Sequence, residues 1–151
     1  MPKLYASALG AGNDEFSATL GQDAEYILGQ SGWEPYPSLG LPGMQQFVED
    51  FQKEFGRIPN SAAATGYAMG QVLEAAVTKV GSLDREKIRD TLAGLDMVTV
   101  FGRYKVDKDG LAIGHEALLI QWQKGKREIV WPEAYATAKL IYPIPSWNER
   151  K

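Results

Sequence analysis

The stretch from Phe47 to Gly81 constrains the fold most, because it has the pattern of two amphipathic helices in succession. Gly56 and Pro59 interrupt it, as a Gly just past a helix end and a Pro shortly after commonly do. The second helix then starts at Asn60 or Ser61, which are both good N-cap residues. The apolar stripe of the first helix follows a 3.6-residue period and consists of Met44, Phe47, Val48, Phe51 and Phe55.

The second predicted helix begins with small side chains and carries larger ones later. Small residues at a helix start allow another backbone or a ligand to approach closely, and the sequence leaves both alternatives open. The small residues are Ala62, Ala63, Ala64 and Gly66, and the larger ones are Val72, Leu73, Val77 and Val80.

The composition is that of one ordinary globular domain, with 151 residues of which 44% are hydrophobic and 23% charged. A net charge of −3 without a basic cluster disfavours a nucleic-acid partner. The absence of cysteine excludes disulfides, thiolate metal sites and a cysteine nucleophile. The sequence lacks an apolar run of about 18 residues and the apolar segment of a signal peptide, so we expect neither a membrane span nor an export signal in this chain.

The N-terminal part predicts a small strand–helix–strand unit, which is the ordinary building block of α/β folds. Its expected elements are a strand over Lys3–Leu9, a helical piece over Asp14–Leu20 and a second strand over Ala24–Leu28. The glycine-rich turn Gly10–Asn13 joins the first two. The stretch Gly29–Gly43 is rich in Gly and Pro, so we expect a surface loop or a crossover between two lobes there.

A third helix and several strands are expected after the helical pair. The helix covers Asp84–Leu92 and is capped by its first residue, and a strand over Val98–Val106 is interrupted by Gly102. A hairpin pairs Ala117–Gln123 with Arg127–Trp131. Beyond it we expect one helical turn within Pro132–Thr137 and an extended tail over Leu140–Trp147. Because so few strands accompany three consecutive helices, we expect part of their covering sheet to lie outside the chain, in a missing segment or a partner subunit.

No catalytic constellation is evident in the sequence. The turn Gly10–Asn13 has the start of a dinucleotide fingerprint, but Phe16 occupies the position of the third glycine. His115 is the only histidine, so a metal centre or a Ser–His–Asp triad lacks convincing partners. We therefore expect a solvent-exposed structural histidine, no enzyme activity, no cofactor and no metal.

Two places in the sequence favour contact with a small ligand. The turn after the first strand would direct its amides and Asn13 toward a crevice where α/β folds bind ligands, although a plain turn explains the same residues equally well. The aromatic residues Trp33 and Tyr67 would either line an apolar pocket or pack in the core. The candidate ligand-binding residues are Gly10, Ala11, Gly12, Asn13, Trp33, Ala62 and Tyr67.

An ordered set of segments resembles the periplasmic solute-binding proteins of ABC importers of the branched-chain amino-acid (Leu/Ile/Val-binding-like) type. The segments are GNDEFSATLGQDAEYILGQSGW, FVEDFQKEFGRIP, AATGYA, VLEAAV, LDREKIRDTLAGL, FGRYKVDKDG, LLIQWQKGKREIVWP and ATAKLIYPIPSW. They cover nearly the whole chain and match only the C-terminal portion of such proteins. The resemblance implies part of a two-lobed, α/β, type I periplasmic-binding fold, with a strand–helix–strand unit, three consecutive helices and a C-terminal hairpin.

The resemblance also implies how the chain divides. Residues 1–33 would be a second-lobe segment and hinge, and residues 34–100 would be helices of the first lobe. Residues 101–151 would form a second crossing, at Phe101-Gly102, and then the hairpin and tail of the second lobe. The sheet that covers the helices would belong to the N-terminal half of the parent protein.

By the same resemblance, Gly10–Asn13 matches a turn that contacts the polar group of the ligand. The acidic residue that binds the amino group of amino acids is missing there, so the expected ligand is an amino acid, an aromatic or other small carboxylate, or an amide. Around Ser61–Ala63 the family can place a bulky side chain over the ligand, and the small residues here would leave room for a larger one.

The sequence thus predicts the C-terminal part of an extracytoplasmic solute-binding protein that captures a small ligand by hinge closure for ABC import. Its partners would be that ligand, the permease subunits through the full-length protein, and either the missing N-terminal half or a second copy in a homodimer. The alternative is a stand-alone ligand-sensing or interaction domain that dimerises through exposed helix faces.

Overall fold

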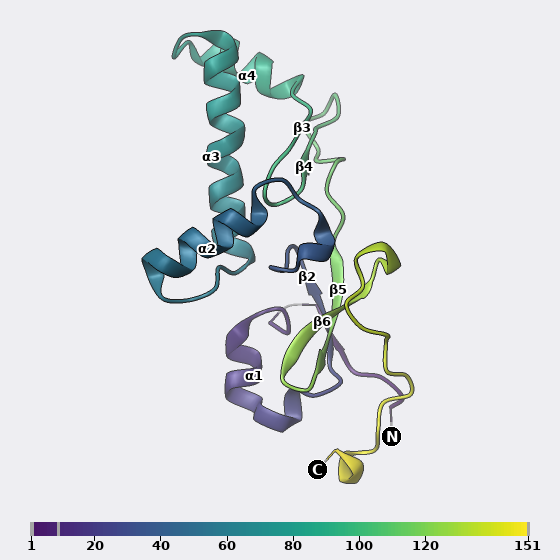
Figure 1. The fold of residues 1–151 in the computed structure, drawn as a ribbon. Coiled ribbons are helices and arrows are strands. Elements are labelled where there is room, and N and C mark those ends of the chain that lie inside the picture. The colour runs from purple at the N-terminus through teal and green to yellow at the C-terminus, as the bar shows by residue number, and fades with distance from the viewer. Residues whose placement is uncertain (1, 9, 151) are drawn as a thin grey trace. The chain divides into compact units, whose positions relative to one another are not determined.

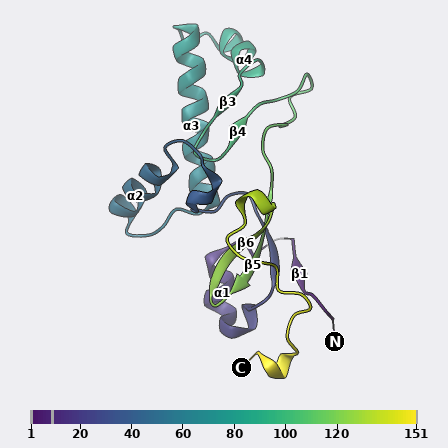
Figure 2. The same cartoon turned by 45° about the vertical axis from the view of Figure 1, so that its right-hand side comes forward.

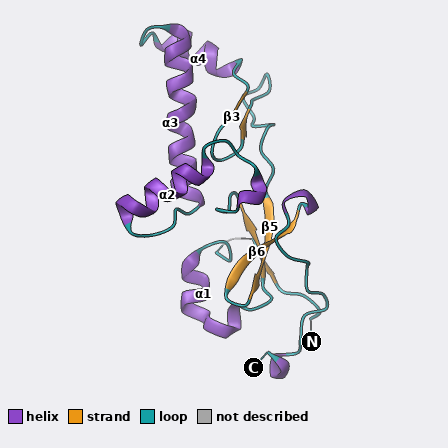
Figure 3. Cartoon of the chain, in the orientation of Figure 1, coloured by secondary structure: helices purple, strands orange, loops and turns teal. Residues whose placement is uncertain are grey.

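The computed structural model describes residues 2–8 and 10–150, and the chain in it forms two compact units. Unit 1 comprises Met1–Glu34 and Ala117–Lys151, and unit 2 comprises Pro35–Glu116. Figures 1 and 2 trace the chain through both units. Strands of the larger sheet belong to unit 1, whereas unit 2 is dominated by helices (Figure 3).

Unit 1 is built on a four-stranded sheet with the order β1-β2-β5-β6. Its strands are β1 (Ala6–Ser7), β2 (Leu28–Ser31), β5 (Leu118–Gln123) and β6 (Lys126–Trp131). The β1–β2 pair is parallel, as predicted, and the other pairs are antiparallel. Helix α1 (Asp14–Leu20) packs on this sheet through Phe16, whose ring stacks on Trp122 at 6.3 Å between centroids.

The predicted hairpin is confirmed in β5 and β6. Both residues of its turn have positive φ, with Lys124 at 55° and Gly125 at 72°, which matches the right-handed twist of the strands. The Glu25 carboxylate accepts hydrogen bonds from the N–H of Lys124 at 2.8 Å and of Gly125 at 2.5 Å. The turn is therefore fixed to the segment that precedes β2.

The tail of the chain extends along unit 1, as predicted. A short 3-10 turn at Glu133–Tyr135 lies within the range where one helical turn was expected. The Gln121 side chain then holds both polar atoms of the Ile141 backbone, at 3.1 Å and 2.9 Å. Further on, the Ile144 N–H donates to the Lys3 carbonyl at 3.0 Å, so the tail lies beside the first residues of the chain.

Two strand predictions in unit 1 need correction. The strand expected at Ala24–Leu28 is wrong, because a 3-10 turn occupies Gly21–Ala24 and β2 only begins at Leu28. Between them Tyr26 adopts a φ of 65° while its N–H donates to the Trp122 carbonyl at 2.8 Å, so a contact distant in sequence overrides local strand propensity. The strand expected at Lys3–Leu9 is reduced to β1, and Leu9 itself lies outside the described residues.

Unit 2 contains the predicted helices α2 (Met44–Phe55), α3 (Ser61–Val80) and α4 (Arg85–Ala93). Their ends follow the sequence signals. The N-cap Asn60 accepts a hydrogen bond from the Ala63 N–H at 3.0 Å, and the N-cap Asp84 accepts two from the first turn of α4. Helix α2 ends at Gly56, whose φ of 67° is the left-handed conformation typical of a glycine C-cap.

A small hairpin replaces the longer strand expected at Val98–Val106. It consists of β3 (Met97–Val98) and β4 (Arg103–Tyr104), and the intervening turn is closed by the Thr99 N–H, which donates to the Gly102 carbonyl at 2.8 Å. Gly102 has a φ of 141°, so the glycine that was expected to interrupt a strand instead reverses the chain.

Residues 101–116 group with the helices of unit 2, and the second boundary between the units falls between Glu116 and Ala117. The division into lobes 1–33, 34–100 and 101–151 stays a prediction. Within the described residues, no helix is long and apolar enough to cross a membrane.

Candidate ligand-binding site

The turn Gly10–Asn13 closes between β1 and α1, where the Asn13 N–H donates to the Gly10 carbonyl at 2.9 Å. Ala11 is fully buried, and its carbonyl accepts a hydrogen bond of 2.7 Å from the indole Nε1–H of Trp122 on β5. Asn13 is exposed, and its side chain makes no capping hydrogen bond to α1. The structure thus anchors the middle of the turn in the core and presents its last side chain to solvent.

Two glycines allow this turn to lie directly against β2. A Cβ on Gly12 would come within 2.6 Å of the Gln30 carbonyl oxygen, and a Cβ on Gly29 would come within 2.7 Å of the Ala11 Cβ. Real Cβ atoms do not approach so closely, so a larger residue at either position would push the turn away from the strand. Close packing on β2 makes the turn rigid, and a loop that contacts a ligand needs such rigidity.

Trp33 follows β2 and is buried in unit 1, with 2% of its surface exposed. The Ser31 hydroxyl donates to the Trp33 carbonyl at 2.9 Å and accepts from the Trp33 N–H at 3.3 Å, which fixes the chain where it leaves the sheet. The packing of Gly12 on Gln30 places the turn beside the strand that leads to Trp33. The unit 1 members of the predicted set therefore belong to one region at the carboxyl ends of β1 and β2, where α/β sheets bind ligands.

A charged cluster in this region was not predicted from the sequence. Arg127 on β6 lies between Asp14, directly after the turn, and Glu34, directly after Trp33. Its Nε lies 3.1 Å from both carboxylate oxygens of Glu34, and its Nη1 pairs with Asp14 Oδ1. The side chains of Glu34 and Arg127 are 2% and 12% exposed, whereas that of Asp14 is 70% exposed. The site therefore holds one buried ion pair and one carboxylate open to solvent.

Burial and charge act in opposition on the pKa of Glu34 and on that of Arg127. Desolvation raises the pKa of Glu34, although the charge of Arg127 opposes the shift. For Arg127, desolvation alone would lower the pKa, but Glu34 and Asp14 together raise it. Among residues 2–8 and 10–150, Glu34 Oε1 accepts no hydrogen bond and has only the ionic contact with Arg127 Nε. The positive charge of Arg127 therefore stabilises the ionised form of Glu34, which burial disfavours.

Ala62 and Tyr67, the remaining predicted residues, lie on the first turns of α3 in unit 2. Ala62 is exposed. Tyr67 is 52% exposed, and one side of its ring packs on Phe47 of α2 at 4.7 Å between centroids. The predicted set is thus divided between the two units, with five residues in unit 1 and two in unit 2.

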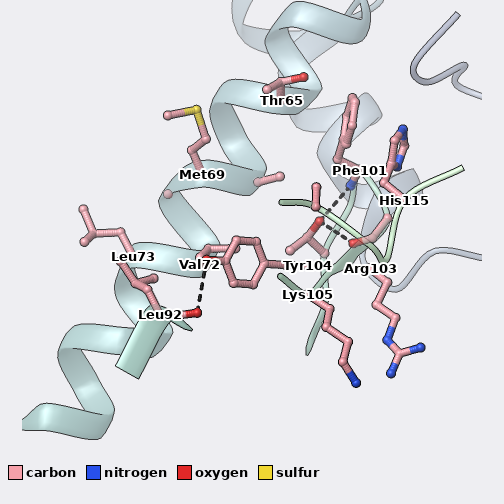
Figure 4. A pocket seen from close by; sticks show the side chains of 15 residues that line it. Thr65, Met69, Val72, Leu73, Leu92, Phe101, Arg103, Tyr104, Lys105 and His115 are labelled. Carbon is pink, nitrogen blue, oxygen red and sulfur yellow. Dashed lines mark hydrogen bonds between the residues drawn. The ribbon is translucent and has the colours of Figure 1, made fainter. Parts of the chain in front are cut away.

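Unit 2 also contains an apolar pocket of about 620 Å³ between α3 and the β3–β4 hairpin (Figure 4). Tyr104 closes one side, where its hydroxyl donates to the Leu92 carbonyl at 3.2 Å, and Phe101 stacks on His115 at 4.6 Å. His115 is solvent-exposed, as expected. The lining consists of Thr65, Ala68, Met69, Gly70, Val72, Leu73, Leu92, Thr99, Phe101, Gly102, Arg103, Tyr104, Lys105, Ala112 and His115.

The two cationic residues at the edge of this pocket share one carboxylate, that of Asp96. Arg103 forms two hydrogen bonds with Asp96, at 2.7 Å and 2.6 Å, and Lys105 forms a third at 3.0 Å. Met69 and Leu73 of α3 are 67% and 53% exposed. No group of three or more potential metal ligands occurs among the residues that the structure describes. The pocket is therefore an exposed apolar surface without a polar centre.

The sequence offered one weak signal for the charged cluster. Glu34 stands between Trp33 and Pro35, and a carboxylate among residues of low polarity is a candidate for burial with a cationic partner. Its partner could not be found by spacing, because Arg127 belongs to the hairpin and reaches Glu34 only in the folded unit.

Comparison with known proteins places this chain in a family. A profile described as periplasmic binding protein matches residues 2–127. The Leu/Ile/Val-binding protein homolog 7 of Brucella abortus (strain 2308) is 30% identical over 107 residues, which cover 68% of this chain and 27% of the relative. The chain therefore spans about a quarter of the length of the curated relatives that it matches.

Solved structures agree with this placement. A leucine binding protein from Thermotoga maritima superposes with a TM-score of 0.70 at 26% identity, covering 82% of this chain and 35% of the other. A solute binding protein from R. palustris, solved in complex with benzoate, has a TM-score of 0.64 at 22% identity, covering 76% and 31%. These neighbours have the type I periplasmic-binding fold, which confirms the fold class predicted from the sequence. The chain belongs to the periplasmic binding protein family.

Proposed function

We propose that this chain is the C-terminal part of an extracytoplasmic solute-binding protein, which captures a small ligand by hinge closure and delivers it to the permease of an ABC importer. The observation that carries the proposal is the anchored turn Gly10–Asn13, which presents Asn13 at the carboxyl end of β1 in a chain of this family. Such a protein binds and releases its ligand unchanged, so the mechanism requires no catalytic group and no cofactor.

The predicted residues would have different roles in binding. The backbone of the turn and the amide of Asn13 would hydrogen-bond to the polar end of the ligand. The buried Trp33 would hold the end of β2 in place beside the turn. Ala62 and the exposed Tyr67 would contribute from unit 2, where the small side chain leaves space and the phenol offers a donor.

Small ligands of two chemical types are suggested by the comparisons. One neighbour is a leucine binding protein, and another was solved in complex with benzoate. A carboxylate is common to leucine and benzoate, and backbone N–H groups of a strand-end turn suit such an anion. We therefore propose an amino acid or a small carboxylate, with an amide as the further candidate.

The experiment is an equilibrium titration of this chain, and of the complete product of the gene that encodes it, with leucine, benzoate and benzamide as probes. We expect the complete product to bind at least one probe with a dissociation constant of about 1 µM, and this chain to bind it at least ten-fold more weakly. Micromolar binding by this chain alone would contradict a ligand site shared with the rest of the protein. Failure of the complete product to bind any amino acid, carboxylate or amide would refute the proposed function.

A second candidate function rests on the exposed apolar side chains of α3. Met69 and Leu73 face the pocket of unit 2 and are mostly exposed, which suits a contact surface for a second copy of the chain. Sedimentation velocity over a hundred-fold range of concentration separates the two functions. A symmetric dimer that Met69→Lys dissociates would support a stand-alone interaction domain, whereas a monomer throughout would exclude it.

A further inference from the structure

Arg127 joins two segments of unit 1 that the sequence separates widely. Asp14 comes directly after the turn Gly10–Asn13, and Glu34 is the last residue of unit 1 before the chain enters unit 2 at Pro35. Arg127 bonds Glu34 through Nε and Asp14 through Nη1. One guanidinium therefore contacts Asp14, the residue that follows the candidate ligand turn, and Glu34, the last residue of unit 1 before Pro35.

The geometry depends on the planar fork of arginine. Different nitrogens of one rigid group bind different carboxylates, whereas the single ammonium of lysine cannot reproduce this arrangement. Arg127 also lies over the Trp122 ring, with 5.7 Å between its Cζ and the ring centroid, and the Trp122 indole holds the Ala11 carbonyl. Arg127 thus contacts two residues that border the turn, namely Asp14, which follows it, and Trp122, whose indole donates to Ala11.

The charges in this cluster make the two contacts compete. One cation serves two carboxylates, and Glu34 Oε1 has no other hydrogen-bond partner among the described residues. A displacement of Arg127 toward Asp14 leaves the buried Glu34 less compensated, which is costly where water is excluded. A change in the Arg127–Asp14 contact therefore changes the Arg127–Glu34 contact, and the reverse also holds.

We propose that Arg127 is a positioning residue that couples the turn Gly10–Asn13 to the junction residue Glu34. The coupling itself is a property of unit 1, and its meaning for ligand capture rests on the function proposed above. A ligand that hydrogen-bonds at Asn13 or Asp14 would change the strength of the ion pair between Arg127 and Glu34. Ligand contact would in this way alter the segment through which the chain passes into unit 2.

Two tryptophan indoles report the two ends of this coupling. The Trp122 indole N–H donates to Ala11 and reports the turn, while the buried Trp33 reports the junction. The experiment measures the solvent exchange rates of both indole N–H groups by nuclear magnetic resonance in the 151-residue chain, without ligand. The variants are Asp14→Asn, Glu34→Gln and Arg127→Lys, and Arg103→Lys is the matched control in the separate Arg103–Asp96 pair of unit 2.

Because the two carboxylates compete for Arg127, we expect Asp14→Asn to slow exchange at Trp33 and Glu34→Gln to slow exchange at Trp122, each about ten-fold, which corresponds to about 1.4 kcal/mol. Arg127→Lys should accelerate both, and adding Asp14→Asn to it should have little further effect at Trp33. Asp14 is mostly exposed, so Asp14→Asn keeps the test decisive if Glu34→Gln fails to fold.

The inference is overturned if Asp14→Asn alters only the Trp122 indole, or if its effect at Trp33 persists in the Arg127→Lys background. An equal change in the Arg103→Lys control would overturn it as well, because the effect would then not require Arg127. Since no ligand is present, this result is independent of the titrations. Coupling without any probe binding would refute the proposed function and leave the coupling established.

Discussion

Replacement of Gly12 by alanine should loosen the turn that carries the candidate site. The added Cβ would lie 2.6 Å from the Gln30 carbonyl oxygen and 3.8 Å from the Ser31 Cα, so it meets backbone that cannot rotate away. Overpacking of this kind costs about 1–3 kcal/mol of unfolding free energy. Gly66→Ala is the matched control, because Gly66 lies within α3 with nothing within 4 Å, and alanine there should stabilise the helix by about 1 kcal/mol.

Urea denaturation followed by two signals separates these effects. The four tryptophans of the chain all lie in unit 1, so their fluorescence reports the unit that contains Gly12. Far-UV circular dichroism reports mainly the helices of unit 2. Gly12→Ala should lower the fluorescence midpoint, and Gly66→Ala should raise the dichroism midpoint. An unchanged or raised fluorescence midpoint for Gly12→Ala would refute the close packing of the turn on β2.

Further predictions concern single contacts. Trp122→Phe removes the indole donor to a buried carbonyl and should lower the stability of unit 1 by about 1–3 kcal/mol, measured by urea denaturation. Asp84→Ala should cost about 1 kcal/mol of helix stability by removing the cap of α4, measured as lost ellipticity on heating. Hydrogen bonds from Arg103 lower the pKa of Asp96, so its stabilising effect is complete above pH 4 and fades as the pH falls below that; the stability difference from Asp96→Asn should shrink accordingly in acid. Burial raises the pKa of Glu34, so the wild type should gain stability relative to Glu34→Gln as the pH falls from 7 toward 4.5, and a loss over that range would contradict the burial.

The helices could be predicted from the sequence because their signals are local. The apolar stripe of α2, its glycine stop and the Asn60 cap all lie within a few residues of the ends that they define. The hairpin of β5 and β6 was predicted for the same reason, since its turn and alternating strands are adjacent in sequence. Sequence alone is sufficient to predict an element when the residues that define it are close together in the chain.

The remaining features depend on contacts between distant segments. The sequence around Tyr26 is typical of a strand. In the structure, however, its N–H donates a hydrogen bond to the Trp122 carbonyl and its φ is positive, so the chain turns before β2 begins. Glu34 and Arg127 belong to segments with no common periodicity, so their pairing is visible only in the fold. The turn Gly10–Asn13 could be nominated from its glycines, but its anchoring through Trp122 could not.

The apolar pocket of unit 2 is better explained as an uncovered packing surface than as a ligand site. One stripe of α3, formed by Ala64, Ala68, Val72 and Ala76, is buried, while Met69 and Leu73 on another part of the helix are exposed. A helix that is apolar on more than one side is normally buried in its complete surroundings. A ligand pocket would also carry a few convergent polar groups, but Arg103 and Lys105 at its edge are already paired with Asp96. The polar turn of unit 1, which Trp122 anchors, is the stronger candidate for ligand contact.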